Sequence, residues 1–160
     1  MRILPVLLAC LLLTSAQAQR NTLTAADLTV FEGAWTGQLV HMDHTSGAET
    51  AIDAILRFVP IAAGTWHRLY GYPKEPGSNE TDTLRLSVDG RMLNEMHVIG
   101  VERDAESTRI VFEEDGEDND KPARIRKTWT GSSRICTMRK DVRSEGAAEF
   151  SLRHEYRLKR

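Results

Sequence analysis

The chain has 160 residues, of which 21 are Lys or Arg and 23 are Asp or Glu, so its formal net charge at pH 7 is −2. This near balance argues against a nucleic-acid partner, because proteins that bind nucleic acids carry a clear excess of basic residues. Hydrophobic residues make up 41% of the sequence, which is enough to bury the core of one domain of ordinary size.

The N-terminal residues have the pattern of an export signal. Arg2 precedes an apolar run from Ile3 to Leu13, and small and polar residues follow as far as Ala18. The run is too short to span a bilayer, and Ala16-Gln17-Ala18 is the small-residue pattern of a cleavage site. We therefore predict a cleaved signal peptide over residues 1–18 and one mature domain over residues 19–160, periplasmic or secreted.

A second interpretation of the N-terminus is a lipoprotein signal. Leu7-Leu8-Ala9-Cys10 resembles a bacterial lipobox, in which the cysteine becomes the lipidated first residue. This leaves an apolar run of only residues 3–8 before the site, so cleavage after Ala18 is favoured. No later apolar stretch approaches the roughly 18 residues of a membrane span. Once Cys10 is removed, Cys136 stands alone, so no internal disulfide is expected.

The rest of the sequence predicts one short helical turn and then a series of strands. Residues 24–27 have the S/T-x-x-D/E pattern that begins a helix. After Val30, apolar and polar residues alternate in segments that are separated by turn residues, which indicates antiparallel hairpins. The predicted strands are 31–41, 52–58, 65–72, 84–88, 91–101, 108–113, 123–129, 133–141 and 148–158.

About nine strands with short connections fit either a closed up-and-down barrel or a two-sheet sandwich. Closure removes exposed strand edges, and no connection has the length of a Greek-key crossover. We therefore predict an all-β fold, a single antiparallel up-and-down β-barrel of about 8–10 strands with a short N-terminal helical turn.

The first predicted strand carries Gly33-Ala34-Trp35 directly after the helical turn. A G-x-W motif at this place, ahead of a series of hairpins, resembles the lipocalins and the wider calycin superfamily. In that family the tryptophan seals the closed end of the barrel, and a basic residue of the last strand packs across it. The resemblance implies a structural barrel plug of Gly33, Trp35 and Arg157, with Arg153 and Arg160 as alternatives for the basic residue.

The stretch Phe31 to Gly37 also resembles the F-x-G-x-W-x-G start of an uncharacterised family of small exported bacterial proteins. This resemblance covers most of the mature chain and implies no activity. Two other lipocalin markers, a T-D-Y-type motif near the middle and a disulfide pair, do not occur in the sequence.

Two polar stretches of the sequence are candidates for metal sites. His41-Met42-Asp43-His44 has H-x-x-H spacing, but on a strand His41 and His44 face opposite sides, and no third ligand is spaced nearby. The acidic segment 113–120 lacks the Gly and Glu positions of an EF-hand calcium loop. We therefore predict no metal site, and interpret the stretches as a strand end and a solvated hairpin loop.

No catalytic residues are predicted. The sequence has no G-x-S-x-G motif, and no local signature accompanies Cys136, which we expect to be a small buried residue. No pair of carboxylates is singled out for acid–base chemistry. The protein is therefore not expected to be an enzyme.

Alternation in the last strand directs His154 into the barrel, on the face that also carries Phe150, Leu152, Tyr156 and Leu158. The residues predicted to face the ligand, because they combine flat apolar area with polar tips, are Trp66, Tyr70, Trp129, His154 and Tyr156. The predicted function is non-catalytic binding of a small apolar ligand in the barrel mouth, without a cofactor.

Two other functions stay open. Residues 33–37 resemble the start of nitrobindin-like haem-binding barrels, which implies His154 as an axial haem ligand, although a core histidine bonded to a tyrosine or a carbonyl is the favoured interpretation. A barrel filled with side chains would act instead as a protein-interaction module through its loops, notably residues 73–81 and 113–121.

Overall fold

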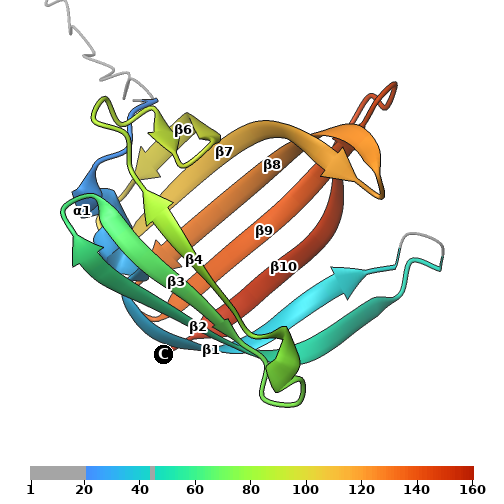
Figure 1. Ribbon diagram of the computed structural model, residues 1–160, viewed down its shortest axis with the longest axis horizontal. Helices are drawn as coiled ribbons and strands as arrows, with labels where there is room; N and C mark the ends of the chain where they lie inside the picture. Colours follow the sequence, from blue (N-terminus) through green and yellow to red (C-terminus); the bar gives the residue numbers. More distant parts are fainter. Residues whose placement is uncertain (1–20, 44–45) are drawn as a thin grey trace, which may run out of the picture.

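The computed structural model describes residues 21–43 and 46–160, which form one ten-stranded antiparallel sheet that curls into a nearly closed barrel (Figure 1). The strand order is β4-β3-β2-β1-β10-β9-β8-β7-β6-β5. Strands that follow one another in sequence are therefore neighbours, except β4 and β5, which are the two edges of the sheet. The first strand, β1, pairs with the last, β10. The all-β up-and-down barrel predicted from the sequence is confirmed. The predicted signal peptide and Cys10 lie outside the described residues.

The strands follow one another along the chain, as the alternation of apolar and polar residues predicted. The strands are β1 Gly33–Met42, β2 Glu49–Ala62, β3 Thr65–Gly71, β4 Glu80–Arg85, β5 Met92–Leu93, β6 Met96–Arg103, β7 Ser107–Asp118, β8 Lys121–Ser132, β9 Ile135–Ser144 and β10 Ser151–Lys159. The helical turns are α1 Ala25–Leu28 and the 3-10 turns η1 Thr29–Phe31 and η2 Pro76–Ser78. The predicted N-terminal helical turn is therefore also confirmed.

The barrel is sealed along β1 and β10 and incompletely sealed along β4. Strands β1 and β10 pair from Thr36↔Lys159 to His41↔His154. On the other side, the end of β4 meets the β5 segment through the bridge Leu86↔Leu93 and through Asn94, which hydrogen-bonds to Arg85 and Thr83. The rest of β4 has no strand partner on that side, which leaves a lateral seam between β4 and the β5–β6 hairpin.

The acidic segment differs from the loop predicted over residues 113–121. Residues up to Asp118 belong to β7, and a tight turn with positive φ at Asn119 and Asp120 leads into β8. Glu113 accepts hydrogen bonds from Arg124 and Arg126 across the ladder. These cross-strand pairs neutralise the acidic residues, so the strand continues where composition alone indicated a loop.

The N-terminal turns close one end of the barrel. The Thr24 backbone N–H donates to Asp27 Oδ2 at 2.7 Å, and Arg103 on β6 donates to the same oxygen at 2.6 Å. This pair ties α1 to the barrel wall. Leu28 and Phe31 are fully buried beneath it.

Trp35 fills the centre of this closed end. Its side chain is fully buried, and the indole N–H donates to the Phe31 carbonyl oxygen at 2.7 Å. The Arg160 guanidinium lies 3.9 Å from the centroid of the Trp35 ring and donates to the carbonyl oxygens of Val30 and Glu32 at 2.8 and 2.9 Å. The basic residue across the tryptophan is therefore Arg160.

The assignment of this role to Arg157 is wrong for a reason of strand geometry. Arg157 lies between the inward residues Tyr156 and Leu158, so it points outward and pairs with Glu155 and Glu49. Gly33 does lie at the plug. Its φ of +102° favours glycine, and a Cβ there would also lie 3.2 Å from Arg160 Nη1, a tight contact that the arginine would have to relieve by a small shift.

An aromatic cluster fills the barrel above the plug. Phe31, Phe58 and Phe112 surround Trp129, with ring centroids 5.9, 5.9 and 4.9 Å from that of Trp129. Trp129 is only 2% exposed. The interior is therefore packed on the closed side of Trp129, and open space begins on its other side.

Candidate binding site at the open end of the barrel

A cavity of about 250 Å³ lies above Trp129 at the open end of the barrel. Its lining combines aromatic and apolar residues with charged ones: Arg68, Tyr70, Glu80, Asp82, Lys127, Trp129, Met138, Arg139, Lys140, His154 and Tyr156. It contrasts with the closed end, where buried side chains are almost all apolar.

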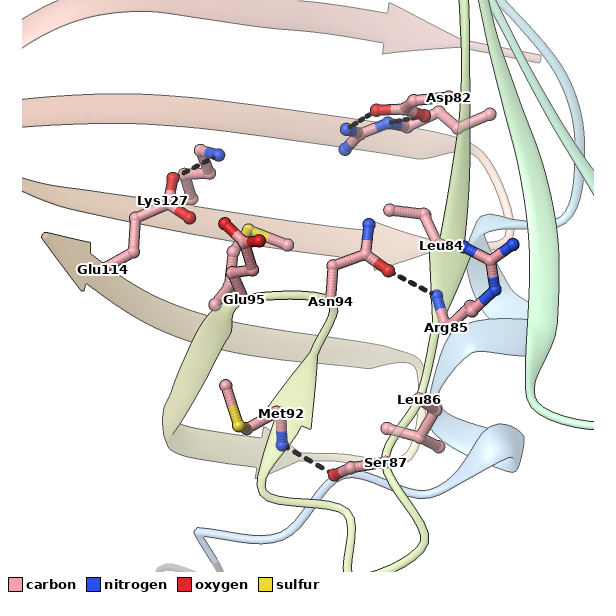
Figure 2. Close-up of a pocket in the computed structure, with 12 residues that line it drawn as sticks. Asp82, Leu84, Arg85, Leu86, Ser87, Met92, Asn94, Glu95, Glu114 and Lys127 are labelled. Atoms are coloured by element: carbon pink, nitrogen blue, oxygen red, sulfur yellow. Dashed lines mark hydrogen bonds and ion pairs between the residues drawn. The ribbon is translucent and has the colours of Figure 1, made fainter. Parts of the chain in front are cut away.

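A second, larger groove of about 640 Å³ follows the lateral seam between β4 and the β5–β6 hairpin (Figure 2). Arg68, Asp82 and Lys127 line both spaces, so the groove and the cavity are contiguous. The cavity is the better candidate site, because its walls are inward side chains of paired strands. The groove is where the barrel fails to close.

Two tyrosines, Tyr70 and Tyr156, make one wall of the cavity. The rings of Tyr70 and Tyr156 lie 5.1 Å apart, and the hydroxyls of Tyr72 and Tyr156 form a hydrogen bond of 2.6 Å. Burial raises the pKa of Tyr70 and, together with the bond to Tyr72, that of Tyr156. Both phenols are therefore neutral at physiological pH, and the Tyr156 hydroxyl is already hydrogen-bonded to Tyr72.

Two ion pairs hold charged residues of the lining in place. Arg68 binds the carboxylate of Asp82 through two nitrogens, and its guanidinium lies about 5 Å from the centroids of both Tyr70 and Trp129. Lys127 Nζ lies 2.6 Å from Glu114 Oε1, as Figure 2 shows on the far wall of the groove. Each of these cations is thus compensated by a neighbouring carboxylate.

A row of basic side chains crosses the rim of the cavity. In the sheet register, Lys127 on β8 pairs with Lys140 on β9, Lys140 with His154 on β10, and His154 with His41 on β1. Lys140 has no ion pair or hydrogen bond among the described residues. Burial lowers the pKa of Lys140, and the nearby Lys127 lowers it further.

His154 is uncharged at neutral pH. Burial and, next, the charge of Lys140 lower its pKa to about 4. Its ring centroid lies 5.7 Å from that of His41 and 6.0 Å from that of Tyr156. The site therefore presents a neutral imidazole beside a cationic lysine.

The residues predicted from the sequence are placed as follows. Tyr70, Trp129, His154 and Tyr156 come together around the cavity. Trp66 does not reach it, because it is buried toward the closed end, where its indole N–H donates to Glu32 at 2.9 Å. Of the H-x-x-H pair, His41 lies beside His154, whereas His44 lies outside the described residues.

The sequence pattern did not lead to the charged residues of the cavity lining. Arg68, Lys127 and Lys140 each stand two positions from an inward residue, namely Tyr70, Trp129 and Met138. Strand alternation alone could have placed them inside. The sequence alone did not single them out, because charged residues rarely point into a barrel.

Over residues 21–43 and 46–160, no group of three or more His, Cys, Asp or Glu side chains is arranged to hold a metal ion. In the same part of the chain, no helix has the length and apolarity to cross a membrane.

No protein-family model and no curated protein matches the sequence. Among solved structures, the chain is similar to the crystal structure of Rv2717c from M. tuberculosis, with a TM-score of 0.59 and 11% sequence identity. The similarity covers 86% of this chain and 98% of that one. At this identity it supports the barrel fold and nothing further.

Proposed function

We propose that the protein is an exported, non-catalytic barrel of calycin type that binds a small ligand, largely apolar in its body, in the open end. The observation that carries the proposal is the cavity above Trp129, with Tyr70 and Tyr156 on its wall. Small barrels either fill their interior with side chains or leave one cup with a few polar groups. This barrel has a filled closed end and an unfilled open end.

The closed end supports the calycin part of the proposal. Trp35 follows Gly33 on the first strand and is capped by Arg160, the residue directly after the last strand. This matches the plug that the G-x-W resemblance implies. Export rests on the sequence of residues 1–18, and the mass of the protein purified from fractionated bacterial cells would test it.

The absence of catalysis is supported by the state of the two most reactive candidates. Cys136 is fully buried in the core, and burial raises the pKa of its thiol to about 12, so the thiolate is scarce at neutral pH. His154 has basic and aromatic neighbours, and within residues 21–43 and 46–160 no carboxylate is bonded to it to orient it as a general base.

Native mass spectrometry of the purified mature protein tests the proposal, followed by a ligand screen that monitors tryptophan fluorescence. Met138→Trp places a larger side chain in the cavity, and Thr137→Trp places the same ring on the outer face of the same strand. Binding that Met138→Trp abolishes and Thr137→Trp retains supports the proposal. An unliganded mass with no hit in the screen would favour a filled barrel that acts through its loops.

Haem is a second candidate, favoured by one observation. His154 lines the cavity as a neutral imidazole, the protonation state that an axial ligand requires. Haem titration of the wild type and of His154→Ala would test this: a Soret band that shifts with the wild type and not with the variant supports it. An unchanged spectrum for the wild type excludes it.

A further inference from the structure

We propose that the ligand is a small aromatic monocarboxylate whose carboxylate binds Lys140. The inference deepens the proposed function and rests on it. It follows from three features of the cavity, namely its charge balance, the position of Lys140 and its size.

The first feature is one uncompensated cation. Arg68 is paired with Asp82, Lys127 with Glu114, and Arg139 with Asp141 at 2.6 Å. Lys140 alone among the cations of the lining has no carboxylate within ion-pair distance in the described part of the chain; Glu114, which pairs with Lys127, offsets its charge only at longer range. The remaining acidic residue of the lining, Glu80, is exposed on β4, where water screens its charge.

The second feature is the place of Lys140 in the row. It is half-buried and lies between Lys127 and His154 in the sheet register. A half-buried ammonium beside another cation is unfavourable unless an anion offsets it, because burial removes water and the like charge repels. His154 pairs with Lys140 in the sheet register, so an anion at this position would also have the neutral His154 ring beside it as a hydrogen-bond donor.

The third feature is the match between cavity and ligand. One unpaired positive charge calls for one negative charge, which favours a carboxylate over a doubly charged phosphate. The cavity volume of about 250 Å³ lies just below the roughly 300–1,000 Å³ of typical small-molecule sites, so it suits a small ligand. Tyr70 and Tyr156 offer ring faces for an aromatic body.

Phenylacetate and its neutral isostere phenylacetamide provide the test. NMR titrations would measure the affinity of each for the wild type, Lys140→Gln and Lys140→Arg. Lys159→Gln is the matched control, because Lys159 is exposed at the far end of β10. We expect the wild type to prefer phenylacetate by roughly 10- to 100-fold, the range for a hydrogen bond to a charged group.

The variants separate charge from shape. Lys140→Gln should lose the preference and keep its affinity for phenylacetamide, whereas Lys140→Arg and Lys159→Gln should retain the preference. Equal affinity of the wild type for both probes, or a preference that survives in Lys140→Gln, overturns the inference and leaves the proposed function intact. If neither probe binds and the resonances of Tyr70 and Tyr156 do not move, both this inference and the cavity as a binding site are overturned.

Discussion

Replacing His154 with Gln should make the fold less sensitive to acid. The pKa of His154 in the folded protein is lowered from 6.5 to about 4, first by burial and then by Lys140, His41, Lys127 and Arg153. The unfolded chain therefore binds more protons than the folded one between these two values. The stability is fully present above pH 6.5 and is lost as the pH falls toward 4.

The size of the effect follows from the interval between the two values. One pKa unit corresponds to about 1.4 kcal/mol, so the shift corresponds to at most about 3 kcal/mol of unfolding free energy lost between pH 7 and pH 4. Carboxylates in ion pairs, such as Asp27 with Arg103, add their own acid dependence. The difference between wild type and His154→Gln isolates the histidine, because both proteins share those carboxylates.

Urea unfolding followed by tryptophan fluorescence at pH 7, 6, 5 and 4 measures this difference. His154→Gln should gain on the wild type as the pH falls, by about 3 kcal/mol at pH 4. His97→Gln, which changes an exposed histidine on β6, is the matched control and should follow the wild type. Parallel curves for wild type and His154→Gln would refute the burial of a neutral imidazole among cations.

Three further predictions concern the closed end. Arg160→Ala should lower the unfolding free energy by about 1–3 kcal/mol in urea titrations, because Trp35 loses its cation and two carbonyl oxygens lose their donor. Arg157→Ala is the control: it breaks only exposed ion pairs, so it should change the unfolding free energy by about 0.5 kcal/mol or less. Gly33→Ala should cost about 1–3 kcal/mol in the same titration, since its φ of +102° strains any side chain; a cost near zero would contradict the observed backbone. Cys136 should react with a thiol reagent at pH 8 only in denaturant, because burial raises its pKa to about 12; rapid reaction of the native protein would contradict its place in the core.

The sequence predicted local features well and distant pairings poorly. Alternation located the strands, and turn residues located the hairpins, because both depend on neighbouring residues. The inward position of His154 was also a local inference. The same inference from alternation fails two residues earlier in this strand, where the register of β10 against β9 shifts between Leu152 and His154. Beyond this bulge Phe150 contacts Arg126 and Arg143, with their guanidinium carbons 4.0 and 4.9 Å from its ring centroid.

The cation over Trp35 and the unpaired Lys140 depend on which strands become neighbours. Arg160 and Trp35 are separated by almost the whole described chain, and only the closure of β1 on β10 brings them together. The lack of an ion-pair partner for Lys140 can be recognised only from the sheet register, which places Lys127 beside it, and from the ion pair between Glu114 and Lys127. Neither fact is encoded in a short stretch of sequence.

The charged rim is difficult to explain as a requirement of folding alone. Lys127 and Lys140 lie directly opposite each other on β8 and β9, and like charges at such positions destabilise a sheet. An apolar residue at position 140 would remove the repulsion and extend the packing of Met138 and Tyr156 toward the open end. Residues that work against stability in this way are concentrated at functional sites. A bound anion at Lys140 would turn the repulsion between the two lysines into attraction of both to the anion. The row of basic residues is therefore explained by binding.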